Sequence, residues 1–295
     1  MIKFRYRIKS KLLLSVLLSA AAFTGCSLQK MAVKASGGII ENTIEALYAE
    51  PDYDLAKEAM PSLLLQLEGL LLSDPGNSGL IINAVKGYTG YALGFIEDED
   101  PDKAGSFYLR ARDHGMGLLS SRSSISKNYQ GSIEEFESAV MRLNERDLPL
   151  IFWTANAWAG YINLNRTNTD ALADQAYVDA LMQKVLDLDE TYFHGSAHMY
   201  FGIVYGERGM AGGDLEKSRE HFEKCFRITN NNFLLSYVMY AKYYAINAFD
   251  EAVFVEALNR VLNTPSDVLP GIQLLNEIAK KKAEILLRNK DEYFF

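Results

Sequence analysis

Cysteine is scarce in this chain, which has two in 295 residues, Cys26 and Cys225. Cys26 ends a leader segment, so Cys225 is the one thiol that the sequence leaves to the folded part. A single thiol cannot form an internal disulfide. We therefore expect the fold to be held by its apolar core, with Cys225 as a buried and unreactive thiol.

Positive charge is also scarce once the leader is set aside. The leader holds five basic residues and no acidic one, which leaves 25 of the 30 Lys and Arg against 38 Asp and Glu, a net charge of −13. Nucleic-acid binding needs clustered Lys and Arg, so no nucleic-acid partner is expected. Anionic headgroups would repel such a chain, so any membrane affinity must come from an attached lipid.

Long apolar runs are absent after the leader. A membrane-spanning helix needs about eighteen or more consecutive apolar residues, and no such run follows residue 26. The twelve-residue apolar run within the leader is too short to cross about 30 Å of hydrocarbon. We therefore expect no transmembrane segment.

The leader itself has the pattern of a secretory signal. Basic residues occupy positions 3–11, an apolar run covers 12–23, and small residues lead to Cys26. The Cys at the cleavage site makes it resemble a bacterial lipoprotein signal, although Phe23 stands where Leu is usual. The resemblance implies a diacylglycerol thioether on Cys26, cleavage before it, and acylation of its new amine. The alternative is an ordinary secretory signal with an incidental Cys.

The leader also predicts the location and the domain organisation. Two or more acyl chains anchor a protein stably, so the mature chain would sit on the periplasmic side of a bacterial membrane. Ser27 follows the Cys, and by resemblance to enterobacterial lipoproteins a residue other than Asp there favours the outer membrane over the inner one. We divide the chain into a signal peptide (1–25), a lipidated Cys with a polar tether (26–37), and a helical-repeat domain (38–295).

Proline is rare, and most of the seven prolines fall where helices would begin or end. Apolar residues recur at spacings of three and four through the rest of the chain, the period of an amphipathic helix. Asp102, Ser132, Asp214 and Asp250 are placed to cap helices or to lie in their first turns. The fold class is all-α, with about twelve helices expected at 38–49, 52–73, 78–96, 101–120, 131–145, 148–163, 171–189, 191–208, 214–229, 231–248, 250–263 and 268–288.

The spacing of large and small residues predicts tetratricopeptide-like helical hairpins stacked into a solenoid. In this pattern a small residue on each helix lets two helices cross closely while an aromatic ring fills the groove beside it. An irregular helical bundle is the alternative. Matches occur at Tyr88, Tyr91, Ala92, Phe95, Ala104, Tyr108 and Ala111, at Gly202, Tyr205, Ser218, Phe222 and Cys225, and, for the first helix only, at Tyr237, Tyr240, Ala241 and Tyr244.

The second half of the chain resembles the T-component (TatT) family of accessory lipoproteins linked to TRAP transporters. The resemblance covers most of the mature chain, is densest after residue 150, and includes no catalytic signature. It rests on Trp153-x4-Trp158, Tyr192-Phe193-His194-Gly195-x2-His198, Gly202, Gly212-Gly213-Asp214, Phe222, Tyr240-Ala241, Leu274-Leu275-Asn276-x2-Ala279, Leu286-Leu287 and Tyr293-Phe294-Phe295.

What the resemblance implies is a periplasmic helical-repeat lipoprotein that forms a homotrimer and docks with the solute-binding subunit of a TRAP transporter. Apolar channels in the family also imply a hydrophobic or lipid-like ligand. A scaffold lipoprotein for envelope or outer-membrane assembly is the alternative function. An apolar lumen would favour the transporter role, and a solid core with a concave polar groove would favour the scaffold. A helical hydrolase is disfavoured, since no nucleophile–base pair is visible, so we expect no enzyme and no cofactor.

One aromatic segment stands out as a candidate ligand site. Trp153, Trp158 and Tyr161 lie at near-helical spacing among Ala and Gly, and large flat rings beside small residues can line a groove or lumen. Asn156 and the hydroxyl of Tyr161 are candidate polar anchors. The alternative is that both indoles fill the core between neighbouring hairpins.

Other patterns have plainer interpretations. His194 and His198 lie four residues apart, a spacing that suits a metal, but no third ligand is evident, so no metal site is predicted. The acidic run at 97–102 lacks the ligand spacing of a calcium loop and is interpreted as a solvated turn. Residues 212–214 lack the strand and the Lys of a P-loop and are interpreted as a turn.

The leader generates a direct test. Cys26→Ala should shift the protein from the membrane fraction to the soluble fraction, because the sequence offers no other anchor. Immunoblots of fractionated cells measure this, with Cys225→Ala as the matched control that should stay with the membrane. Retention of Cys26→Ala at the membrane to the wild-type extent would contradict lipid anchoring at this residue.

Overall fold

The computed structural model describes residues 37–123, 125, 131–207 and 213–295. All regular secondary structure within these ranges is helical, which confirms the all-α class predicted from the sequence. The signal peptide (1–25), Cys26 and all of the tether except residue 37 lie outside the described residues, so predictions about them stay predictions. None of the helices in the described ranges is both long enough and apolar enough to cross a membrane.

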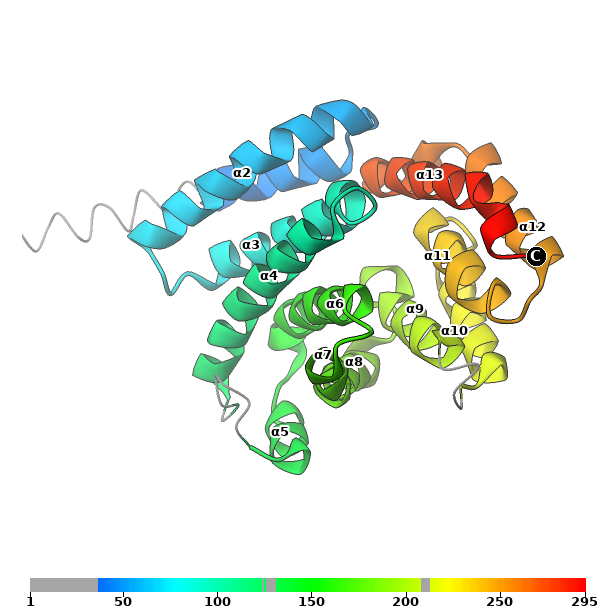
Figure 1. The fold of residues 1–295 in the computed structure, drawn as a ribbon. Helices are drawn as coiled ribbons and strands as arrows, with labels where there is room; N and C mark the ends of the chain where they lie inside the picture. The colour runs from blue at the N-terminus through cyan, green and yellow to red at the C-terminus, as the bar shows by residue number, and fades with distance from the viewer. Residues whose placement is uncertain (1–36, 124, 126–130, 208–212) are drawn as a thin grey trace, which may run out of the picture.

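The helix bounds agree with the periodicity of the sequence over most of the chain. Helices labelled in Figure 1 are joined by short links, and a further helix covers residues 37–48. In chain order they are α2 (Tyr53–Ser73), α3 (Ser78–Tyr91), α4 (Pro101–Arg122), α5 (Ile133–Val140), α6 (Leu148–Leu164), α7 (Thr169–Ala173), α8 (Gln175–Asp189), α9 (Tyr192–Glu207), α10 (Leu215–Ile228), α11 (Leu234–Met239), α12 (Glu251–Asn263) and α13 (Gln273–Arg288).

Side-chain caps fix several helix starts, as the sequence predicted. The side chains of Ser132, Asp214 and Asp250 accept hydrogen bonds from the first turns of α5, α10 and α12. Asp102 lies in the first turn of α4, whose N-cap is Asp100. These bonds satisfy amides that would otherwise lack partners at the helix ends.

Three predicted helices differ from the observed ones for local reasons. The helix expected at 171–189 is two helices, α7 and α8, which meet at Asp174. The helix expected at 268–288 begins at Gln273, because Gly271 adopts a φ of 79° that a helix does not allow. The helix expected at 131–145 ends at Val140.

Two of the helices widen into π-helical turns at their C-terminal ends. Segment η1 (Ala92–Ile96) continues α3, and η3 (Tyr240–Ala245) continues α11. A π-turn inserts an extra residue into the helical repeat and so changes the direction of the side chains that follow it. Both turns lie at the cavity described below.

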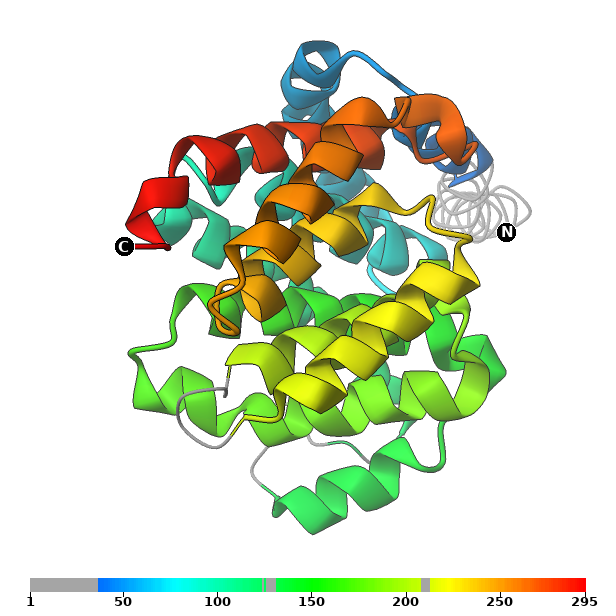
Figure 2. The same cartoon turned by 90° about the vertical axis from the view of Figure 1, so that its right-hand side faces the viewer.

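The helices follow one another in chain order along a curved path whose last helix returns to the first ones (Figure 1). Consecutive contacts run from α2 to α3, α4, α6, α8, α9 and α10, and then through η3 and α11 to α12 and α13. The last helix, α13, returns to pack on α2 and η1 near the start of the chain. The second view shows α13 lying across the N-terminal helices (Figure 2). The arrangement is therefore a closed ring, and its tetratricopeptide register stays a prediction.

A buried charge cluster joins the two ends of this ring. Lys282 on α13 places its ammonium 2.7 Å from an oxygen of Glu97 and 2.5 Å from one of Asp98, and its side chain is 8% exposed. The hydroxyl of Tyr108 donates to the other Glu97 oxygen at 2.6 Å. Buried charges are tolerated when they are paired and hydrogen-bonded in this way.

Small residues permit the closest helix crossings. Ala92, Ala104 and Ala111 are fully buried. A Cβ added to Gly202 would lie 2.7 Å from the ring of Phe222. The tightest approach to backbone is at Gly206, where an added Cβ would lie 2.3 Å from the carbonyl oxygen of Tyr243 in η3. Backbone cannot rotate away as a side chain can, so only glycine fits there.

This crossing gives a stability prediction. Gly206→Ala should lower the free energy of unfolding by about 1–3 kcal/mol, because the methyl group overpacks against η3. The matched control is Gly69→Ala in α2, where an added Cβ meets no atom within 4 Å. That substitution should raise stability by about 0.5–1 kcal/mol through helix propensity. Urea denaturation measures the free energy of unfolding of both variants. Equal effects of the two substitutions would mean that α9 and η3 do not cross this closely.

Candidate functional site

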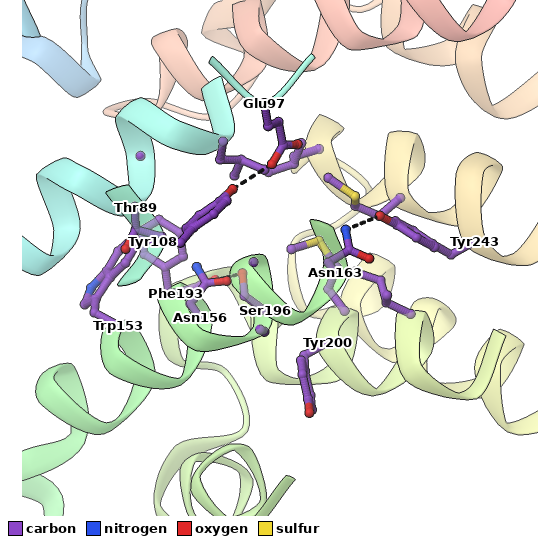
Figure 3. A pocket seen from close by; sticks show the side chains of 18 of the residues that line it. Thr89, Glu97, Tyr108, Trp153, Asn156, Asn163, Phe193, Ser196, Tyr200 and Tyr243 are labelled. Atoms are coloured by element: carbon purple, nitrogen blue, oxygen red, sulfur yellow. Dashed lines mark hydrogen bonds between the residues drawn. The ribbon is translucent and has the colours of Figure 1, made fainter. Parts of the chain in front are cut away.

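Helix α6 packs between α4 and α8 in the ring and presents different residues on its two faces. Trp153, Asn156, Gly160 and Asn163 recur at spacings of three and four, which places them on one face of the helix. This face lines a cavity inside the ring (Figure 3). The opposite face packs on α8. At 1.5 Å per residue, the cavity face of α6 from Trp153 to Asn163 is about 15 Å long.

The cavity has a volume of ≈ 110 Å³ and a mostly apolar wall. Besides α6, helices α3, α4, α9, α11 and α13 contribute lining residues. Besides the α6 face, the wall includes Leu93, Phe193, Met199, Ile203, Val204, Phe233, Leu235, Met239 and Leu275. A mostly apolar wall with a few polar groups is typical of small-molecule sites.

Two of the four predicted ligand residues lie in this wall. Trp153 and Asn156 both contribute to it. Trp158 is fully buried on the other side of α6, where its indole N–H donates to a carboxylate oxygen of Asp174 at 3.0 Å. Tyr161 is partly buried close to Gly105 of α4 and is not part of the wall. The ligand-binding role of the four residues stays a prediction.

The wall at Trp153 depends on an irregular turn that the sequence did not predict. Phe193, His194 and Gly195 all have positive φ values, so α9 starts with a left-handed turn. This turn brings the centre of the Phe193 ring to 4.6 Å from the centre of the Trp153 ring. An added Cβ at Gly195 would meet Ile228 at 2.8 Å, so the position also needs glycine for space.

The same turn separates the two histidines that a regular helix would have aligned. The carbonyl of His194 accepts a hydrogen bond from the buried thiol of Cys225, and burial raises the pKa of that thiol to about 12. His198 instead faces His221, with 3.0 Å between their Nδ1 atoms. Burial lowers the pKa of both rings, that of His221 to about 4.

The cavity wall holds two mutually satisfied polar pairs, and one of them, Asn163 with Tyr243, lies at the end away from Thr89 (Figure 3). Glu97 directly follows η1 and accepts from Tyr108, while Tyr243 in η3 accepts from the amide of Asn163 at 2.6 Å. Arg166 donates to Asn163 at 3.0 Å and forms an ion pair with Glu207. Burial, and then Glu97, raise the pKa of Tyr108, so it stays a neutral donor.

The other end of the cavity holds polar groups that lack such partners. Thr89 on α3 is 1% exposed, and its hydroxyl has no hydrogen-bond partner among the described residues. A second cavity of ≈ 40 Å³ adjoins the first there, since Tyr48, Gly90 and Leu275 line both. Lys86 lies in the wall of the second cavity, with its ammonium 5.6 Å from the centre of the Trp153 ring.

The two faces of α6 predict different responses to mutation. Trp158→Ala removes a fully buried ring and a hydrogen bond, so it should cost about 3–5 kcal/mol in the free energy of unfolding. Asn156→Ala, on the same helix but at the cavity, should cost much less. Urea denaturation of both variants is the measurement. A small loss for Trp158→Ala would show that α6 does not pack on α8 as described.

Comparisons with known proteins address the family of the chain. The model of the family described as TRAP transporter T-component matches residues 49–294. An uncharacterised protein of Treponema pallidum (strain Nichols) is 22% identical over 302 residues, an alignment that covers 92% of this chain and 93% of that protein. The family match includes every helix that lines the larger cavity from α3 onward.

Proposed function

This chain belongs to the TRAP transporter T-component family, and we propose that it is a lipid-anchored periplasmic accessory component of such a transporter. In this proposal it docks with the transporter's solute-binding subunit and binds a hydrophobic ligand. The family match supports the accessory role. The lipoprotein-like leader supports anchoring at Cys26 and exposure to the periplasm, on the outer rather than the inner membrane. No catalytic step is part of the proposal.

The apolar cavity is the observation that carries the ligand-binding part of the proposal. Its wall is mostly apolar, it runs along α6, and Leu275 of α13 contributes to it. A scaffold lipoprotein would instead be expected to have a solid core and a concave polar groove for a peptide. The apolar cavity therefore supports the transporter role over the scaffold.

The outer surface supports self-association, and the family resemblance is what suggests a homotrimer. Leu65 and Leu72 lie seven residues apart on α2 and are 71% and 85% exposed, so they share one face of the helix. Large exposed apolar side chains on one face are typical of an interface. Because closed cyclic symmetry is common among soluble oligomers, a second copy of the chain is the proposed occupant of this face.

Sedimentation analysis tests assembly and docking together. The protein beginning at residue 27 should sediment as a trimer alone, and as a larger complex with the TRAP solute-binding protein of the same organism. Leu65→Glu combined with Leu72→Glu should give a monomer, since a charge in an apolar interface is costly. The control Leu172→Glu changes an exposed leucine on α7 and should leave the trimer intact.

Each part of this proposal can fail separately in that experiment. A wild-type monomer at tens of micromolar would contradict self-association. A trimer that persists in the α2 double variant would place the interface elsewhere. A trimer that does not bind the solute-binding protein would contradict docking.

A further inference from the structure

Lys86 is the one charged residue in the wall of the smaller cavity. The rest of that wall is apolar apart from the hydroxyl of Tyr48 and two glycines. No carboxylate among the described residues lies within ion-pair distance of the Lys86 ammonium, which lies over the face of the Trp153 ring, 5.6 Å from its centre. Glu41 and Glu45 act on it only through space. A partly buried ammonium without a counter-ion is costly, and an anion at this point would relieve that cost.

Thr89 provides a second donor beside Lys86. The two residues are three positions apart on α3, so their side chains leave the same face of the helix. The hydroxyl of Thr89 is buried without a partner and lies in the wall of the larger cavity, on the same side as Trp153 (Figure 3). A buried hydroxyl without a hydrogen bond loses its hydration and gains nothing in exchange, so it favours an acceptor.

Other cations near the cavity already have partners. Lys282 is paired with Glu97 and Asp98, and Arg166 is paired with Glu207. Lys242 lies over the Tyr243 ring, and Tyr243, Glu97 and Asp98 favour its charged form. An anionic group that enters the cavity would therefore meet an available positive charge at the Lys86 end. The polar end at Asn163 and Tyr243 has its donors and acceptors matched to each other.

We propose that Lys86 and Thr89 bind the carboxylate head of a singly charged amphiphile whose alkyl tail lies in the two adjoining cavities. A carboxylate accepts hydrogen bonds from both donors, and the bond to the ammonium is charge-assisted. One cation, with Glu41 and Glu45 nearby, suits one negative charge and disfavours a dianion such as a phosphate monoester. The apolar walls on both sides of the head suit a hydrocarbon tail.

The influences on the pKa of Lys86 are consistent with a carboxylate head group. Burial lowers the pKa of Lys86, while Glu41 and Glu45 act in the opposite direction. A bound carboxylate would act in the same direction as the glutamates and hold the ammonium in its charged form. Trp153, which lines the larger cavity, would then contribute a cation–π contact to the ammonium through its ring face.

A pair of ligands with the same tail isolates the contribution of the head. Decanoate and decanol differ only at the head group, so calorimetric titration of both into the protein beginning at residue 27 measures the preference for the carboxylate. The wild type should bind decanoate at least about tenfold more tightly, as one charge-assisted hydrogen bond provides. Lys86→Met keeps an unbranched apolar stem, and should remove this preference while leaving the affinity for decanol within about twofold, since only the charge is lost.

Two further variants complete the design. Thr89→Val keeps the shape of the side chain and removes the hydroxyl, so it should reduce the preference for decanoate in part. Lys103→Met, at an exposed position on α4, removes one positive charge elsewhere and should change neither affinity. Circular dichroism spectra that match the wild type establish that the variants are folded.

The outcomes separate this inference, which rests on the proposed ligand-binding function, from that function itself. If the wild type binds both ligands equally, or if Lys86→Met keeps the preference for decanoate, the head-group assignment is wrong and the apolar cavity retains its proposed role. If neither ligand binds, both the assignment and the hydrophobic-ligand proposal are wrong. A preference that is lost in Lys86→Met and kept in Lys103→Met supports the assignment.

Discussion

The structure depends on the contact between Lys282 of α13 and the carboxylates of Glu97 and Asp98, which joins residues more than 180 positions apart. Helix α13 also packs on α2 and η1, with Ile278 beside Gly94. Apolar contacts and this charge cluster therefore close the helices into a ring together. Because the lysine is buried, loss of either partner leaves a charge without compensation, so the closure is strongly specified.

The cavity follows from that closure and from the two different faces of α6. One face carries Trp158 into the interface with α8, which stabilises the ring, while the other carries Trp153 and Asn156 to the interior. The π-turns η1 and η3 then aim polar side chains at one end of the cavity. The result is an interior with one end whose hydrogen bonds are complete and another, near Thr89, whose hydrogen bonds are not.

Local chemistry explains which features could be predicted from the sequence. Capping by Ser132, Asp214 and Asp250 needs only residues within one turn, and their roles are confirmed. The left-handed turn at the start of α9 was not predicted, since Phe193 and His194 have no intrinsic preference for positive φ. Packing against Trp153 and Phe233 holds that conformation, and those partners come from distant parts of the chain.

The sequence by itself determined the all-α class, most helix bounds and the family, because these depend on apolar periodicity, capping and local residue patterns. It identified the aromatic segment of α6, but two tryptophans five residues apart look alike in sequence. Only the tertiary structure decided that Trp153 faces a cavity and Trp158 faces α8, because burial depends on what packs against each face of a helix. The pairing of Lys282 and the lack of a partner for Lys86 were decided in the same way, by which carboxylates the closed ring brings near each ammonium.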